Sequence, residues 1–180
     1  MDEQTLVLVL SINIIIMAIL IIFIAIYNKF QNNIIAINEA EASIDSELRK
    51  RFDLLNKSVK VIKSYIGHEK EVLEDVVKLR SRRLTSLELD TELNESIKQF
   101  YALSEEYADL KASDNFLKLL ESITEVEEHL SGCRKFYNHK VATYNKQVRR
   151  FPSNIIAKLF KYKLKPYFEV KEKDNSLKGL

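Results

Sequence analysis

The stretch from Leu6 to Tyr27 reads LVLVLSINIIIMAILIIFIAIY, and it determines what kind of protein this chain is. It contains no charged residue, and Ser11 and Asn13 are its only clearly polar members. At 1.5 Å per residue a helix of this length extends for about 33 Å, enough to cross a hydrocarbon core of about 30 Å. The stretch therefore predicts a single transmembrane helix over residues 6–27.

A cleaved signal peptide is the alternative interpretation of this stretch. Such peptides begin with a basic segment, contain an apolar run of about 7–15 residues and end at a small-residue cleavage site. Here the preceding segment Met1-Asp2-Glu3 carries acids and no base, the apolar run is longer, and no A-x-A pattern closes it. We therefore expect residues 6–27 to be retained as an anchor.

The basic residues that flank the anchor predict its orientation. None precedes the span, whereas Lys29 and the cluster Arg49–Arg51 follow it. Cytoplasmic flanks of membrane spans carry an excess of Lys and Arg. The pattern predicts a single-pass protein of the cell membrane, with residues 1–5 outside and the C-terminal domain in the cytoplasm.

The composition of the chain favours helices over sheets. Its 180 residues include three glycines and two prolines, and no proline precedes Pro152. Sheets need tight turns, which depend on these residue types. The net charge of +2 gives no overall basic field of the kind expected in a nucleic-acid-binding protein. The single cysteine, Cys133, excludes an internal disulfide. We therefore predict an all-α protein with no nucleic-acid partner.

Apolar residues recur at steps of three and four after the anchor, as they do on the buried face of a helix. Three series precede residue 110, and they comprise Ile34, Ile37, Ile44, Leu48, Phe52, Leu55, Val59, Ile62 and Ile66; Leu73, Val76, Val77, Leu84 and Leu87; and Leu93, Ile97, Phe100, Leu103 and Tyr107. Each series must be buried on a neighbour, and short connections favour antiparallel packing. We predict an up-and-down bundle of four helices over residues 28–156. A three-helix bundle, with Glu69–Tyr107 as one helix, is the alternative; the potential N-cap pair Asp90-Thr91 favours four.

The clearest series belongs to the last helix of the bundle, after a predicted cap at Ser113-Asp114. It comprises Phe116, Leu119, Ile123, Val126, Leu130, Cys133, Tyr137, Val141, Tyr144, Val148 and Phe151. Pro152 is expected to end this helix, and Ser153 to cap a short final turn. Asn138 and Asn145 each follow a tyrosine of the series, so we predict that their amides bond a neighbouring helix and fix its register. Two solvated asparagines are the alternative.

Residues that carry catalysis or bind metals do not combine into a site in this sequence. No two glycines lie close enough for a phosphate-binding loop, and no histidine has the carboxylate three residues earlier that a di-iron bundle requires. Cys133 is interpreted as a core residue. The basic clusters Arg49–Arg51, Arg80–Arg83 and Arg149–Arg150 are interpreted as solvent-facing, because acids are interleaved nearby. We expect no enzyme activity, no cofactor, no metal and no small-molecule substrate.

The C-terminal tail, residues 157–180, combines basic and aromatic residues. From Arg149 to Leu180 nine basic residues oppose three acids, a net charge of +6. Such segments suit anionic membrane surfaces, where each nearby Lys or Arg contributes about 1 kcal/mol. The predicted membrane-surface contact comprises Lys158, Lys161, Tyr162, Lys163 and Lys165. A solvated tail packed loosely on the bundle is the alternative.

An ordered set of short motifs resembles the LemA family of bacterial and archaeal membrane proteins. The motifs are Tyr27-Asn28, Lys50-Arg51-Phe52-Asp53-Leu54, Tyr65 to Val72, Tyr107 to Ala112, Asn115-Phe116-Leu117, Arg134, Tyr137-Asn138, Tyr144-Asn145, Phe151-Pro152, Asn154, Ala157, Phe160 and Tyr167-Phe168-Glu169. They extend over nearly the whole chain in register. The sequence departs from the family pattern where Asn56 and Ala108 replace prolines, and where Phe160-Lys161-Tyr162 replaces Phe-Gly-Phe.

The resemblance implies a membrane-anchored helical bundle with its larger part in the cytoplasm, and it implies no established activity or catalytic residue. We hypothesise a membrane-tethered, non-enzymatic module that contacts the lipid bilayer and binds a protein partner or organises the membrane face. Two alternatives stay open. One is an enzyme or metal-dependent module with a site dispersed across the bundle, and the other is a self-assembling coiled coil, that is, a homo-oligomer.

Overall fold

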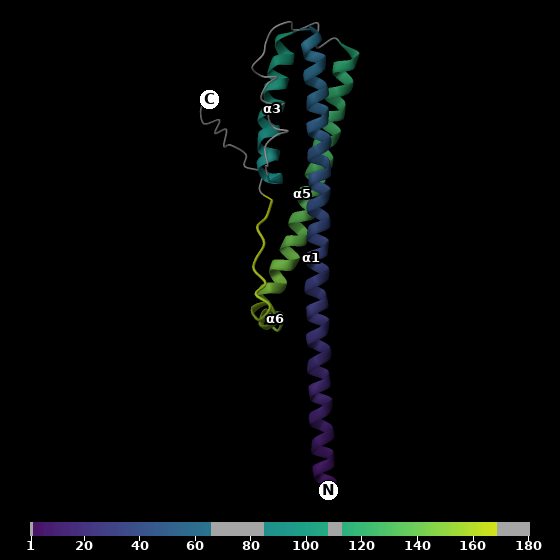
Figure 1. Ribbon diagram of the computed structural model, residues 1–180, viewed down its shortest axis with the longest axis vertical. Helices are drawn as coiled ribbons and strands as arrows, with labels where there is room; N and C mark the ends of the chain where they lie inside the picture. The colour runs from purple at the N-terminus through teal and green to yellow at the C-terminus, as the bar shows by residue number, and fades with distance from the viewer. Residues whose placement is uncertain (1, 66–84, 108–112, 169–180) are drawn as a thin grey trace, which may run out of the picture. The chain divides into compact units, whose positions relative to one another are not determined.

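Helices account for all the regular structure in the described part of the chain. The computed structural model describes residues 2–65, 85–107 and 113–168. The helices there are α1 (Glu3–Tyr65), α3 (Ser86–Glu106), α5 (Asp114–Arg149) and α6 (Ser153–Leu159), and these residues form no strand (Figure 1). The prediction of an all-α chain with a long N-terminal apolar helix followed by a helical bundle is confirmed.

Contacts divide the chain into two compact units. The first combines Met1–Glu39 with Asn138–Tyr167, and the second combines Ala40–Tyr137 with Phe168–Leu180. Helices α1 and α5 each contribute to both units, because they are continuous across the boundaries at residues 39 and 137. The first unit contains the apolar stretch and α6, and the second contains the core formed by α1, α3 and α5.

In the first unit, α1 changes from apolar on every side to apolar on one side. Its large hydrophobic residues from Leu6 to Ile22, and Ile24, are exposed by 48% to 69%, whereas Phe23 is half-buried and Phe30 is fully buried. The helix is long and apolar enough to cross a membrane by length and composition. It continues without a break to Tyr65, so the apolar stretch and the first helix of the bundle form one element. Asn56, where the family pattern has proline, lies inside this helix and bonds the Phe52 carbonyl.

In the second unit, α3 runs parallel to α1 and α5 runs antiparallel to both. Asp45 of α1 accepts a hydrogen bond from Ser86, and Arg51, further along α1, bonds Asn94, further along α3. Ser86 therefore lies level with Asp45, about 30 Å back along α1 from Tyr65. The three-helix alternative is wrong, because it requires α3 to run opposite to α1. The predicted series Leu73–Leu84 lies outside the described residues.

The capping pattern of α3 corrects one sequence-based interpretation. Asp90-Thr91 was expected to begin a helix, but both residues lie within α3. The helix is capped instead at Thr85, whose hydroxyl accepts the Glu88 N–H while the Glu88 carboxylate accepts the Thr85 N–H at 2.9 Å. This reciprocal pair satisfies two amide groups that the helix leaves unbonded. The backbone hydrogen bond from Thr85 lowers the pKa of Glu88.

The apolar series of α5 packs inward until its last member. Phe116, Ile123, Val126, Leu130, Tyr137, Val141 and Tyr144 are buried, while Phe151 is 74% exposed, contrary to its predicted place in the core. α5 begins at Asp114, as predicted, and ends at Arg149, just before Pro152. The predicted final turn is α6. However, the Ser153 hydroxyl donates to the carbonyls of Gln147 and Arg150 at the end of α5 rather than capping α6.

Truncation of Leu130 tests the assignment of the α5 seam. The side chain is fully buried, so Leu130→Ala should lower the free energy of unfolding by about 2–5 kcal/mol. Urea unfolding of the full chain in mild detergent, followed by circular dichroism, measures this. The matched control Leu117→Ala, on the same helix but 49% exposed, should change it by about 0.5 kcal/mol or less. Equal effects of the two substitutions would show that the seam is misplaced.

Candidate functional site

The turn after α6 directs the chain back onto α1 within the first unit. The Tyr162 N–H donates to Ala157 O and the Lys161 N–H to Lys158 O, the paired bonds of a Schellman motif. Lys161 has a φ of 56°, in the left-handed region that favours glycine. This is the position at which the LemA pattern has the glycine of Phe-Gly-Phe. The lysine therefore adopts the conformation that the family pattern provides with glycine.

Aromatic rings fix this turn against the end of the apolar stretch of α1. The Phe160 ring lies 5.2 Å from the Tyr27 ring and 6.1 Å from the Phe23 ring, measured between centroids. The Tyr162 ring lies 4.8 Å from Phe30, and its hydroxyl accepts a 2.8 Å hydrogen bond from Gln31. The residues after α6 are therefore level with residues 23–31 of α1.

The five residues predicted to contact a membrane surface differ in how far they are exposed. Lys158, Lys161 and Lys163 are exposed, and Lys165 is half-buried. Tyr162 packs inward on Phe30, so it supports the turn rather than forming part of its surface. The lysines carry their charge at the level where the apolar stretch of α1 ends.

Four exposed hydrophobic side chains lie near these lysines in the chain. Leu159 and Phe160 stand among the lysines in the sequence, as the predicted membrane-surface segment requires, whereas Phe151 was expected in the core. Phe151 is 74% exposed, Ile155 59%, Leu159 65% and Phe160 42%; we call these four residues the apolar edge. Ile155 and Leu159 are four residues apart and share one face of α6, while Ile156 and Ala157 are buried on another. The α6 segment is therefore amphipathic, and the outward position of Ile155 follows from the burial of its neighbours.

Asn145 holds the extended segment after this turn against α5. Its Nδ2 donates to the Lys165 carbonyl and its Oδ1 accepts the Lys165 N–H, both at 2.9 Å. The Asn145 amide thus binds the backbone of an extended segment and not a neighbouring helix. This corrects the predicted partner of Asn145. A side-chain amide is well suited to this role because it offers a donor and an acceptor together.

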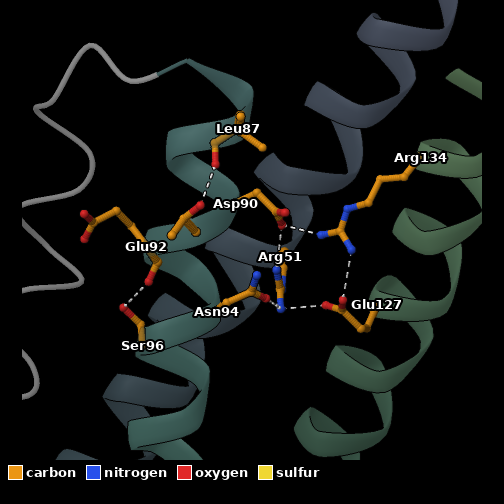
Figure 2. Close-up of polar contacts among 9 residues, drawn as sticks. Arg51, Leu87, Asp90, Glu92, Asn94, Ser96, Glu127 and Arg134 are labelled. Atoms are coloured by element: carbon orange, nitrogen blue, oxygen red, sulfur yellow. Dashed lines mark hydrogen bonds and ion pairs between the residues drawn. The ribbon is translucent and has the colours of Figure 1, made fainter. Parts of the chain in front are cut away.

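The second unit contains a network of buried charges that joins its three helices (Figure 2). Arg51 of α1 donates to Asp90 Oδ1 at 3.1 Å and to Asn94 Oδ1 at 2.6 Å, both on α3. Its Nη2 also lies 2.6 Å from Glu127 Oε2 of α5. Arg134 of α5 donates to the same Asp90 oxygen and contacts Glu127 Oε1 at 3.5 Å. Two guanidinium groups and two carboxylates therefore balance in charge.

Burial opposes the charged forms of this network. It raises the pKa of Asp90 although Arg134 and Arg51 lower it, and it lowers the pKa of Arg51 although Glu127 and Asp90 raise it. In both groups the loss of hydration outweighs the attraction of the partners. We therefore predict that the network selects one arrangement of the helices more than it adds to their stability.

The place of Arg51 corrects the interpretation of its basic cluster. Arg51 was assigned to a solvent-facing cluster with Arg49 and Lys50, but it is 2% exposed while both neighbours are exposed. The sequence indicated the burial of Arg51 through its place in the helical period. Arg51 lies three residues after Leu48 and four before Leu55, and both leucines are fully or almost fully buried. The helical period therefore places Arg51 in the core, although its charge suggested a solvent-facing position.

The described residues show no cluster that suits a metal ion. They contain no group of three or more His, Cys, Asp or Glu side chains close enough to bind one. Cys133 is partly buried, and burial, followed by the charge of Glu47, raises the pKa of its thiol. A raised pKa keeps the group as the less nucleophilic thiol.

Substitutions in the charge network test whether its ion pairs stabilise the bundle. Asp90→Ala leaves two buried guanidinium groups without their shared partner and should lower the free energy of unfolding by about 3–5 kcal/mol. The triple variant Arg51→Met, Asp90→Leu and Arg134→Met removes the three buried charges and leaves only Glu127, whose side chain is 41% exposed, so it should be at least as stable as the natural chain. Urea unfolding measures both. A triple variant as unstable as Asp90→Ala would show that the ion pairs themselves stabilise the bundle.

Curated relatives resemble this chain over a limited segment. The magnetosome proteins MamQ 1 and MamQ 2 of Paramagnetospirillum magneticum are each 29% identical over 70 residues, which is 39% of this chain and 26% of theirs. MamQ of Magnetospirillum gryphiswaldense is 26% identical over the same length. The matched segment thus spans about a quarter of each relative.

A family match extends over much more of the chain. The family model described as the LemA family matches residues 40–178, which include the whole charge network, α6 and the turn that follows. This agrees with the motifs that run in register from Tyr27 to Glu169. The chain belongs to the LemA family.

Proposed function

We propose that this LemA protein is a membrane-tethered, non-enzymatic interaction module whose bundle lies at the cytoplasmic face of the cell membrane. The observation that supports the tether is the surface of α1. Large hydrophobic side chains cover every side of the helix from Leu6 to Ile22 and are exposed by about half or more. An apolar surface of this length matches a bilayer core and is unfavourable in water.

The proposed interaction role is supported by where the charged groups of the chain lie. Arg51, Asp90 and Arg134 are committed to one another inside the bundle. The outer faces of α3 and α5 carry alternating charges and a few exposed hydrophobic residues, including Leu87 and Leu117. Exposed leucines scattered in this way are ordinary on a protein surface, so the proposed role rests on the commitment of the network charges to packing.

Charges placed within the span test the tether. The double variant Ile15→Lys and Ile19→Lys should release the chain from membranes, because each lysine at the centre of a span costs about 2.5–3.5 kcal/mol. Alkaline extraction of membranes, followed by detection of the chain in pellet and supernatant, measures this. The control Ile15→Leu and Ile19→Leu should stay in the pellet, as should the natural chain. A natural chain found in the supernatant would contradict the tether.

Single cysteines test the proposed orientation. In a Cys133→Ser background, Asp2→Cys should react with a membrane-impermeant maleimide on intact cells. Lys118→Cys, on the exposed face of α5, should react only after the cells are permeabilised. The physical reason is the basic flank of the span, which favours the cytoplasmic side. Labelling of Lys118→Cys on intact cells would reverse the orientation.

A further inference from the structure

We propose that a hollow beside α6 binds the phosphate of an anionic lipid headgroup. The hollow has a volume of about 500 Å³ and is lined by Ala142, Asn145, Lys146, Arg149, Arg150 and Tyr167. This inference rests on the proposed membrane tether, because the tether brings the hollow to the lipid. It assigns the first unit a ligand that neither the family nor the relatives name.

Two elements of the first unit form the walls of the hollow. Ala142, Asn145, Lys146 and Arg149 are spaced three, one and three residues apart, so they share one face at the end of α5. The opposite wall is the extended segment that carries Tyr167. The two hydrogen bonds between Asn145 and the Lys165 backbone hold this segment in place, so Asn145 builds the hollow as well as lining it.

The charge of the hollow favours an anion. Lys146, Arg149 and Arg150 are all exposed, and in the described part of the chain no carboxylate pairs with them. The C-terminal end of a helix carries a partial charge of about −0.5, which opposes an anion but is far smaller than three positive charges. Guanidinium groups bind phosphate oxygens in pairs, and the Tyr167 hydroxyl adds a neutral donor.

The hollow lies at the level where the apolar stretch of α1 ends. Gln147, between Lys146 and Arg149, accepts a hydrogen bond from Asn33 and donates to the carbonyl of Ile26 at 3.4 Å. The end of α5 is therefore level with the residues around Tyr27, where the predicted span meets water. Headgroup phosphates occupy this level in a bilayer.

The apolar edge distinguishes a lipid from a free phosphate ion. Phe151 follows Arg150 directly in the chain and Ile155 lies five residues after it, and both are more than half exposed. Phe160 contacts Phe23, which lies inside the predicted span. Apolar side chains at this level fit acyl chains while the cations beside them fit the headgroup. An inorganic phosphate would use the cations and leave the apolar edge in water.

Lipid retention by the full chain tests this assignment. The chain is purified in a neutral detergent, titrated with phosphatidylglycerol or with phosphatidylcholine, and bound lipid is counted by native mass spectrometry. The natural chain should retain phosphatidylglycerol at least about tenfold more tightly than phosphatidylcholine. The variant Lys146→Gln, Arg149→Gln and Arg150→Gln should lose this preference, because each cation contributes roughly fivefold.

Two controls of equal charge show whether the hollow itself binds the lipid. One changes Lys158, Lys161 and Lys163 to Gln beside α6, and the other changes Lys60, Lys118 and Lys135, which are exposed in the second unit. The control in the second unit should keep the preference in full. The control beside α6 removes nearby surface charge but none of the lining of the hollow, so it should lose clearly less of the preference than the hollow variant. An equal loss with the first control would overturn the proposal in favour of diffuse attraction to the tail. Unchanged binding by the hollow variant would also overturn it, and so would displacement of the lipid by equimolar inorganic phosphate.

Alkaline extraction of the same variants separates this inference from the proposed function. The hollow variant should remain in the membrane pellet, because its span is intact. If the natural chain is in the pellet and the hollow variant binds phosphatidylglycerol normally, only the headgroup site is refuted. If the natural chain is in the supernatant, the tether fails.

Discussion

The exposed apolar surface of α1 is the constraint on which the rest of the structure depends. Residues 6–27 carry no charge, and within the described ranges the large side chains from Leu6 to Ile22 are all exposed, so Phe23 is the first that packs on another ring. The same helix continues into the bundle and buries Ile37, Ile44 and Leu48 on one face. Because the helix is unbroken, any medium that accepts the apolar stretch also fixes the level at which the rest of the first unit lies. The aromatic contacts of Phe160 and Tyr162 then hold the turn after α6 at that boundary.

Several parts of the fold were predictable because they depend on one local rule each. The apolar period of α5 identified its buried face from Phe116 to Tyr144, and Pro152 identified its end. The Asp90-Thr91 cap was wrong because a residue pair that caps helices also occurs inside them. Thr85 with Glu88 offered the stronger signal, a reciprocal capping box. The direction of α3 became clear only from contacts between distant residues, such as Asp45 with Ser86.

The site was less predictable than the fold, because it depends on which polar residues face inward. Arg51, Asp90 and Arg134 have ordinary surface chemistry, and their burial follows from helices that the sequence does not place side by side. The tail lysines, with Leu159 and Phe160 among them, were recognised by composition, whereas the exposure of Phe151 was not. Phe151 continues the helical period of α5, but the helix ends at Arg149 and the ring turns outward. Asn145 was singled out correctly, but its partner is the backbone of Lys165, 20 residues away.

Depth measurements with single spin labels test the central claim, the membrane tether, most directly. Labels are attached at Ile15→Cys, Leu159→Cys and Lys118→Cys in a Cys133→Ser background, with the full chain reconstituted in vesicles. The account predicts that oxygen, which concentrates in lipid, relaxes the label at Ile15 most strongly. A water-soluble nickel complex should relax the label at Lys118 most strongly, and the label at Leu159 should be intermediate. A label at Ile15 as accessible to nickel as the label at Lys118 would contradict the account.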